Sequence, residues 1–96
     1  MDRGIVLLQL GKDEEAVKDF TAAINLDSTL VMAFYNRGLA NIGLTNWERA
    51  IEDFTRTIDL EPDFGPAYNN RGGTWINLNE FEKAINDLNH ATNLDS

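Results

Sequence analysis

The sequence predicts an all-α solenoid, a linear stack of antiparallel helix pairs. Three observations predict this fold class: an internal repeat of 34 residues, two amphipathic helical patterns in each repeat, and a composition that suits one small domain. The chain has 96 residues, of which 43% are hydrophobic and 25% charged. This length suits a single domain and is too short for a multidomain enzyme.

The 34-residue repeat runs through the whole chain. Seven positions hold the same residue in all three units: Arg3/Arg37/Arg71, Gly4/Gly38/Gly72, Leu10/Leu44/Leu78, Glu14/Glu48/Glu82, Ala16/Ala50/Ala84, Asp19/Asp53/Asp87 and Leu26/Leu60/Leu94. Self-similarity at a fixed period of this length is typical of stacked helical units. We therefore expect one repeat domain over residues 1–96, made of units 1–30, 31–64 and 65–96, with the first unit truncated at its start.

The second helix of each unit is predicted from the spacing of apolar residues. Positions i, i+3, i+4, i+7 and i+11 form one buried stripe on a helix. In the second unit these positions are Trp47, Ala50, Ile51, Phe54 and Ile58. Thr45 and Asn79 each precede a Glu by three residues, which is the spacing of a capping box. We expect these two residues to be the N-caps of the second helices, with Gly11 in the corresponding place of the first unit.

The first helices of the second and third units are predicted from capping residues and a proline. Thr29 and Asp63 are suitable N-caps, and the helices that follow them are expected to end near Leu44 and Leu78. Pro66 falls in a first turn, where no helical hydrogen bond is lost.

Small residues recur on both helices of each predicted pair. A glycine inside a helix costs about 0.5–1 kcal/mol relative to alanine, so its recurrence indicates a packing requirement. We expect each glycine to face the alanine twelve positions later, which would let two antiparallel backbones approach closely. These small pairs are Gly4 with Ala16, Gly38 with Ala50, and Gly72 with Ala84.

This 34-residue helix pair resembles the tetratricopeptide repeat, whose pattern combines aromatic, Leu-Gly, Tyr, Ala, Phe and Pro positions. The matching residues are Phe34 and Tyr68 at the opening aromatic, the glycine and alanine columns, Phe20 and Phe54 at the later aromatic, and Pro62 at the closing proline. The resemblance covers the entire chain and implies a right-handed superhelix of about three units.

The chain also departs from the family pattern. The units are of an Asn-Arg-Gly type, with Arg replacing the usual Leu before the glycine, as in Asn36-Arg37-Gly38. Leu7 and Asn41 stand where the family has Tyr, and Trp75 is the aromatic substitute at that position.

Paired charge columns predict ion pairs within the hairpins. An Arg of the first helix and an Asp of the second recur together, and the pairs are Arg3 with Asp19, Arg37 with Asp53, and Arg71 with Asp87. The alternative is that each arginine extends past apolar neighbours into water.

Composition excludes several classes of function. The formal net charge of −8 opposes binding to a phosphate backbone, so no nucleic-acid partner is expected. No apolar run reaches the length of a membrane span, and no signal peptide is recognised, which favours a cytoplasmic protein. The chain has no Cys and one His, His90, which is expected on the surface. We expect no catalytic residues, no metal and no cofactor, and therefore no enzyme.

By resemblance to the family, the first helices line a concave groove that holds a peptide or helix of a partner protein. The groove residues are then Tyr35, Asn36, Leu39, Asn69, Asn70, Gly73 and Asn77. Asn side chains both donate and accept, so they are able to pair with the backbone of an extended peptide. The alternative is that Asn reflects a local composition bias, since most of the Asn residues lie in the last third of the chain.

One subclass of the family grips the C-terminal carboxylate of chaperones through two Asn and several Lys or Arg. Asn36 matches one of the two Asn, but the other position is Ile5, and the cationic positions are Met1, Pro66 and Asn70. A chaperone-tail adaptor is therefore disfavoured, and a neutral or basic peptide suits the net charge better.

The ends of the repeat suggest a second hypothesis. Asp13 replaces the aromatic residue found at Trp47 and Phe81, and the chain stops without the extra helix that commonly closes such arrays. This chain is then a piece of a longer scaffold, or its terminal repeat pairs with another copy to form a homo-oligomer.

Overall fold

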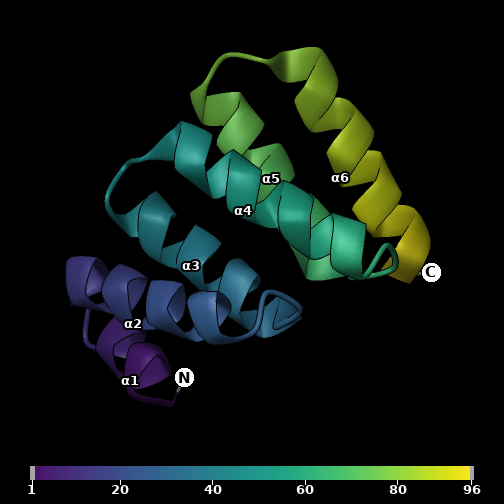
Figure 1. The fold of residues 1–96 in the computed structure, drawn as a ribbon. Coiled ribbons are helices and arrows are strands. Elements are labelled where there is room, and N and C mark those ends of the chain that lie inside the picture. Colours follow the sequence, from purple (N-terminus) through teal and green to yellow (C-terminus); the bar gives the residue numbers. More distant parts are fainter. Residues whose placement is uncertain (1, 96) are drawn as a thin grey trace.

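The computed structural model describes residues 2–95, which form six helices and no strand. The helices are α1 (Asp2–Gln9), α2 (Asp13–Leu26), α3 (Val31–Gly43), α4 (Trp47–Leu60), α5 (Gly65–Asn77) and α6 (Phe81–Asp95). Each helix packs against its neighbours in the chain, and α1 also contacts α3. The result is an elongated stack of three hairpins, 34 × 24 × 20 Å, in which α2 and α4 lie in front of α3 and α5 in Figure 1.

The glycines of the first helices face the aromatic position of the second helices. A Cβ atom added to Gly38 would lie 2.6 Å from the ring of Phe54, and one added to Gly4 would lie 2.8 Å from the ring of Phe20. The atoms nearest to each added Cβ therefore belong to the residue sixteen positions later, in addition to the expected alanine in the case of Gly72 and Ala84. The alanines are themselves buried, and the carbonyl oxygen of Ala84 is among the three atoms nearest to a Cβ added to Gly72, at 3.3 Å.

The capping-box prediction for the second helices is wrong. α4 and α6 begin at Trp47 and Phe81, and no side chain caps α4. Thr45 and Asn79 instead have left-handed backbones, with φ of 58° and 61°, and Gly11 has φ of 76° at the same repeat position. Short polar residues suit both an N-cap and a left-handed C′ position, so the sequence pattern did not separate the two roles.

These left-handed residues close the preceding helix. The N–H of Lys12 donates to the carbonyl of Leu7 at 2.8 Å, and Asn46 donates to Asn41 in the same way at 2.8 Å. A bond from one residue beyond the left-handed position back to the last turn defines a Schellman motif. The motif fixes the direction in which each second helix leaves the first.

The first helices also begin without the expected caps. α3 and α5 follow Leu30 and Phe64, and neither helix receives a side-chain hydrogen bond at its N-cap. Thr29 instead donates through its N–H and its hydroxyl to the Asp27 carboxylate, at 3.0 and 2.6 Å. Pro66 does lie in the first turn of α5, as its sequence position indicates.

Candidate functional site

The arginine of the second hairpin joins three helices. Arg37 donates through Nη2 to Asp53 Oδ1 at 2.8 Å and through Nε to both carboxylate oxygens at 3.1 Å. Its Nη1 also donates to Thr21 Oγ1 of α2 at 3.1 Å. The bond to Asp53 closes its own hairpin, and the bond to Thr21 reaches the hairpin before it.

The third hairpin repeats this arrangement. Arg71 donates to the Asp87 carboxylate at 2.7 and 2.8 Å, and its Nη1 donates to Thr55 at 3.2 Å. In the first hairpin Arg3 lies 3.4 Å from Asp19, and its side chain is exposed. The threonines were missed by reasoning on charge alone, although Thr21 and Thr55 are separated by the same 34 positions as the arginines.

Burial decides the electrostatics of this network. Asp53 is 4% exposed, and desolvation raises its pKa even though Arg37 and Asn41 donate hydrogen bonds to the carboxylate. The hydrogen bond to Asp87 raises the pKa of Arg71. Both arginines and both aspartates thus act as internal ties between helices, and none is positioned as part of the predicted groove.

Tyr35 and Asn70 connect the first helices of two hairpins. Asn70 Nδ2 donates to the Tyr35 hydroxyl at 2.8 Å and to the Pro66 carbonyl at 3.0 Å. The Tyr35 ring packs edge-on against Phe64, with 5.1 Å between centroids, and desolvation raises its pKa. The Asn70 donors are therefore engaged within the chain, and its Oδ1 remains the group it can offer to a ligand.

Asn36 differs from Asn70 because its amide has no partner. The residue is 8% exposed, and no side-chain hydrogen bond joins it to any residue from 2 to 95. Its neighbours on α3 contact other helices: Tyr35 faces α5, and Arg37 faces α2 and α4. Successive residues of an α-helix are turned by 100° about its axis. The Asn36 side chain therefore points away from α4. Leu39, one turn on, is half-buried. Together with Tyr35, these two residues are the members of the predicted groove that lie on α3.

The third hairpin adds an open and polar surface. Asn69, Gly73 and Asn77 are exposed, and a Cβ added to Gly73 would meet no atom within 4 Å. A pocket of about 560 Å³ lies beside this surface. Its lining is Tyr35, Asp63, Gly65, Pro66, Asn69, Asn70, Ala91, Thr92 and Leu94.

This pocket brings together only part of the predicted set. Tyr35, Asn69 and Asn70 line it, whereas the other groove candidates, Asn36, Leu39, Gly73 and Asn77, lie outside its lining. Asp63, predicted as a helix cap, is the one charged side chain among the described residues that line it. A carboxylate at this place favours a neutral or cationic ligand group over an anionic one.

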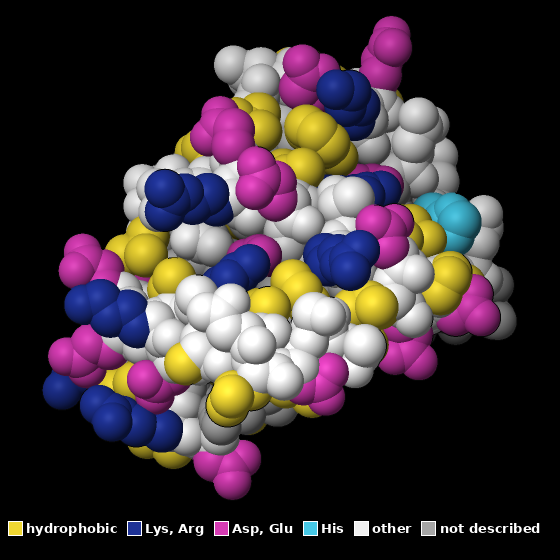
Figure 2. Space-filling model, in the orientation of Figure 1, with side chains coloured by type: hydrophobic (Ala, Val, Ile, Leu, Met, Phe, Trp, Pro, Cys, Tyr) yellow, Lys and Arg dark blue, Asp and Glu magenta, His cyan; other side chains and the backbone are white. Residues whose placement is uncertain are grey.

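The opposite face carries mixed charge. In Figure 2, which shows the molecule as in Figure 1 with α2 and α4 toward the reader, basic and acidic side chains alternate and hydrophobic ones appear between them. No large field of one sign is visible on this face. It gives no sign of a surface for a polyanion.

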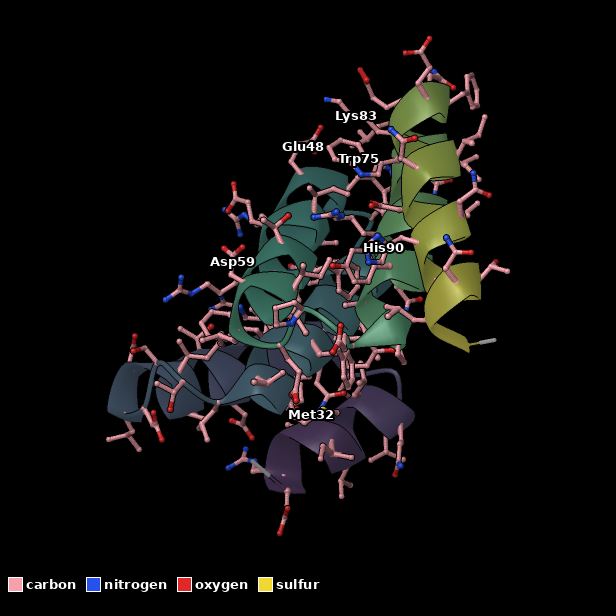
Figure 3. All side chains as sticks on the ribbon, turned by 90° about the vertical axis from the view of Figure 1, so that its right-hand side faces the viewer. Met32, Glu48, Asp59, Trp75, Lys83 and His90 are labelled. Atoms are coloured by element: carbon pink, nitrogen blue, oxygen red, sulfur yellow. The ribbon has the colours of Figure 1, made fainter. Side chains whose placement is uncertain are left out.

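Residues with catalytic or metal-binding chemistry are not assembled. His90 is exposed and stacks on Tyr68, with 4.1 Å between ring centroids, and Figure 3 shows it on α6. Among the residues that the structure describes, no group of three His, Cys, Asp or Glu could hold a metal ion. Over the same residues, no helix is long and apolar enough to cross a membrane.

The fold and the surface define a helical-repeat solenoid of stacked hairpins. Residues 4–44 match the family model described as TPR repeat, and residues 65–96 match the model described as tetratricopeptide repeat. The two matches cover most of the chain, and the chain belongs to the tetratricopeptide repeat family. A search of curated protein sequences gives no match.

Solved structures of the same fold include peptide complexes. The second TPR of Spaghetti (RPAP3), bound to HSP90 peptide SRMEEVD, is 28% identical, with a TM-score of 0.94 over 97% of this chain and 86% of that one. The second TPR domain of human RPAP3, in complex with HSP70 peptide SGPTIEEVD, is also 28% identical, with a TM-score of 0.93 over 97% and 78%.

A bacterial structure shows the same fold in a longer chain. MamA from Desulfovibrio magneticus RS-1 is 22% identical, with a TM-score of 0.94 over 98% of this chain and 53% of that one. The present chain spans about half the length of the MamA structures that it matches. At this identity the likeness concerns the fold alone.

Proposed function

We propose that this chain is a non-catalytic protein-interaction module that binds a peptide or helix of a partner in the groove of its first helices. The observation that carries the proposal is Asn36, a residue that is 8% exposed and whose amide has no hydrogen-bond partner among residues 2–95. Water still reaches this amide, since Asn41 Oδ1 is the fully buried side-chain polar atom without a partner among the described residues, so the Asn36 amide is open to a ligand. A peptide backbone offers the donor and acceptor that an Asn amide needs.

The groove has contacts suited to both parts of a peptide. Leu39 supplies an apolar surface beside Asn36, and Asn69 and Asn77 supply exposed amides on α5. Gly73 leaves open space between them, so a ligand is able to approach the backbone of α5 closely. The peptide complexes of RPAP3, which are 28% identical in sequence, support a peptide as the kind of ligand.

The charge of the groove supports a different peptide from those in the RPAP3 complexes. The peptides named there end in Glu-Glu-Val-Asp. In this chain the family's cation positions on α5 hold Pro66 and Asn70, and Asp63 lines the adjacent pocket. Together with the net charge of −8, this favours a neutral or basic peptide.

A substitution at Gly73 provides a test that leaves the fold intact. Gly73→Arg places a long side chain in open space within α5, where replacing glycine also favours the helix. Peptides selected from a random display library on the wild type are expected to bind Asn36→Ala about tenfold more weakly, because one buried amide contact is lost. They are expected to lose measurable binding to Gly73→Arg.

A matched control separates groove blocking from a change of charge. Asn86→Arg introduces the same side chain at an exposed position of α6, a second helix that contributes no residue to the predicted groove. Fluorescence anisotropy with the selected peptides should give the wild-type dissociation constant for this variant. Equal binding by the wild type and Gly73→Arg, or preferential binding of SRMEEVD, would contradict the proposal.

A second candidate function is self-association through α6. Phe81 and Ile85 are 56% and 57% exposed, whereas the equivalent Trp47 and Ile51 of α4 are half-buried where α5 packs on α4. Exposed apolar residues on one helix face favour contact with another protein surface. Ile85→Glu is expected to shift a concentration-dependent oligomer to monomer in sedimentation equilibrium, and a wild type that is monomeric at all concentrations would exclude this role.

A further inference from the structure

A second pocket lies away from the groove, where α2, α3 and α4 meet. Its volume is about 260 Å³, and Thr21, Arg37, Asn41, Arg49 and Asp53 are among its lining residues. Three of these belong to the hydrogen-bond network already described. Asn41 and Arg49 each carry a polar group that this network leaves unused.

The unused group of Asn41 is its side-chain oxygen. Asn41 is 3% exposed, and its Nδ2 donates to Asp53 Oδ2 at 3.0 Å. The carboxylate accepts only, so this bond fixes the orientation of the amide and leaves Oδ1 as an acceptor. In the described part of the chain Oδ1 is the buried side-chain polar atom that has no hydrogen-bond partner. Such an atom is destabilising unless a donor reaches it.

The repeat shows what occupies the corresponding position one unit later. Trp75 stands 34 positions after Asn41, and Lys83 stands 34 positions after Arg49. The indole of Trp75 is half-buried in the third hairpin, and the Lys83 ammonium lies 4.6 Å from its ring centroid. Figure 3 shows the two side chains next to one another at the end of the hairpin where α6 begins.

We infer that the 260 Å³ pocket is a binding site for an indole, in the place that the Trp75 ring takes one unit later. Because water does not reach Oδ1 in the free protein, the Asn41 side chain shifts toward the pocket on binding, and the indole N–H then donates to Oδ1, which satisfies the unpaired acceptor. The guanidinium of Arg49 covers the face of the ring, as the Lys83 ammonium covers Trp75. Arg49 is available for this contact because it is exposed and no other described residue pairs with it.

The surrounding charges favour a neutral ring over an anion. Arg37 is already bonded to Asp53 and Thr21. Glu52 and Asp53 both line the pocket and oppose a second carboxylate. An aromatic ring with one donor therefore matches the pocket in volume, in hydrogen bonding and in charge.

The test compares two ligands of the same shape. The ¹⁵N-labelled wild type is titrated with indole and with benzothiophene, which has the same fused rings and no N–H donor. Saturable shifts are expected for the Asn41 side-chain amide and the Arg49 Nε–H, with about fivefold tighter binding of indole. No saturable shift at these two groups, or equal affinity for both compounds, would overturn the inference.

Three variants test the geometry independently. Asn41→Trp fills the pocket with the side chain of the next unit and is expected to abolish binding. Asn41→Leu copies Leu7 of the first unit, removes the acceptor, and should bind the two compounds equally. Arg49→Gln, at an exposed position, is expected to weaken indole about threefold. The assigned contacts would be refuted if Asn41→Leu still preferred indole over benzothiophene as strongly as the wild type does, and if Arg49→Gln bound indole with unchanged affinity.

A further titration identifies the source of the indole. N-acetyltryptophanamide presents the ring as a peptide would, with backbone groups attached. Binding within about threefold of indole assigns the pocket to a tryptophan of a partner protein, and exclusive binding of free indole assigns it to a small molecule. Because this pocket shares no residue with the predicted groove, its outcome is independent of the proposed peptide binding.

Discussion

Arg37 of one hairpin and Thr21 of the hairpin before it are joined by a hydrogen bond of 3.1 Å from Nη1 to Oγ1. The same guanidinium holds Asp53 of its own hairpin. One side chain thus contributes both to the closure of a hairpin and to the stacking of two. This double role makes the arginine network the first target for stability measurements.

Loss of one member of the ion pair is expected to cost more than the net contribution of the pair. Asp53→Ala leaves the partly buried Arg37 guanidinium without its carboxylate and should lower the free energy of unfolding by about 3 kcal/mol. The double variant Arg37→Ala/Asp53→Ala should be destabilised by less than the sum of the single variants. Urea denaturation followed by circular dichroism measures all three. Additive losses would show that the two side chains act separately.

The raised pKa of Asp53 predicts how its ionisation affects stability. Because the folded-state pKa lies above the ordinary value of 3.8, the folded protein holds this proton more tightly than the unfolded chain. The resulting stabilisation is complete below pH 3.8 and is lost as the pH rises through the folded pKa. The stability of the wild type relative to Asp53→Asn should therefore fall across this interval in urea denaturations at a series of pH values. A difference that rises with pH would indicate a lowered pKa.

Thr45 is a site where glycine should stabilise the protein. A β-branched residue with φ of 58° is strained, and the equivalent Gly11 adopts φ of 76° without a side chain. Thr45→Gly should raise the free energy of unfolding by about 1 kcal/mol, measured as an increase in Tm. Asn79→Gly is the control, because Asn tolerates this conformation and should gain less. A lower Tm for Thr45→Gly would show that its hydroxyl bond to the Leu44 carbonyl matters more than the strain.

Two glycines of similar sequence context should respond in opposite directions to alanine. Gly38→Ala places a methyl group 2.6 Å from the Phe54 ring, which is fully buried, and should destabilise the protein by about 1–3 kcal/mol through overpacking. Gly73→Ala meets open space and should stabilise it by about 0.5–1 kcal/mol. Thermal unfolding of the two variants checks the signs. If both variants changed the free energy of unfolding in the same direction, then helix propensity alone or packing alone would govern these positions.

The 34-residue period made the fold predictable, because each unit specified the same helix pair. Local details were less accessible. Thr45 and Asn79 carry a pattern that fits an N-cap, and only the three-dimensional path of the chain shows that they end one helix instead of starting the next. Periodicity also identified the glycine column, but it did not predict that the Phe54 ring is the group nearest to Gly38, since this depends on side-chain direction on two packed helices.

The candidate site was less predictable than the fold. Asn36 and Asn70 occupy the same position in the repeat, yet Asn70 bonds to Tyr35 and Asn36 has no partner. Tyr35 belongs to the preceding first helix, so its bond to Asn70 is a contact between units and leaves no signal within one unit. The sequence also could not predict that Asn41 Oδ1 lacks a hydrogen-bond partner, because this follows from the bond to Asp53 that fixes the orientation of the amide.

The bonds from Arg37 to Thr21 and from Arg71 to Thr55 also bear on how the solenoid bends. Each joins a first helix to the second helix of the hairpin before it, at a length of 3.1 or 3.2 Å that a hydrogen bond tolerates only within a few tenths of an ångström. A change in the angle between adjacent hairpins must therefore break such a bond or find a new acceptor for Nη1. The angle between adjacent hairpins therefore changes in discrete steps. Breaking one of these two hydrogen bonds sets the free-energy cost of bending the solenoid.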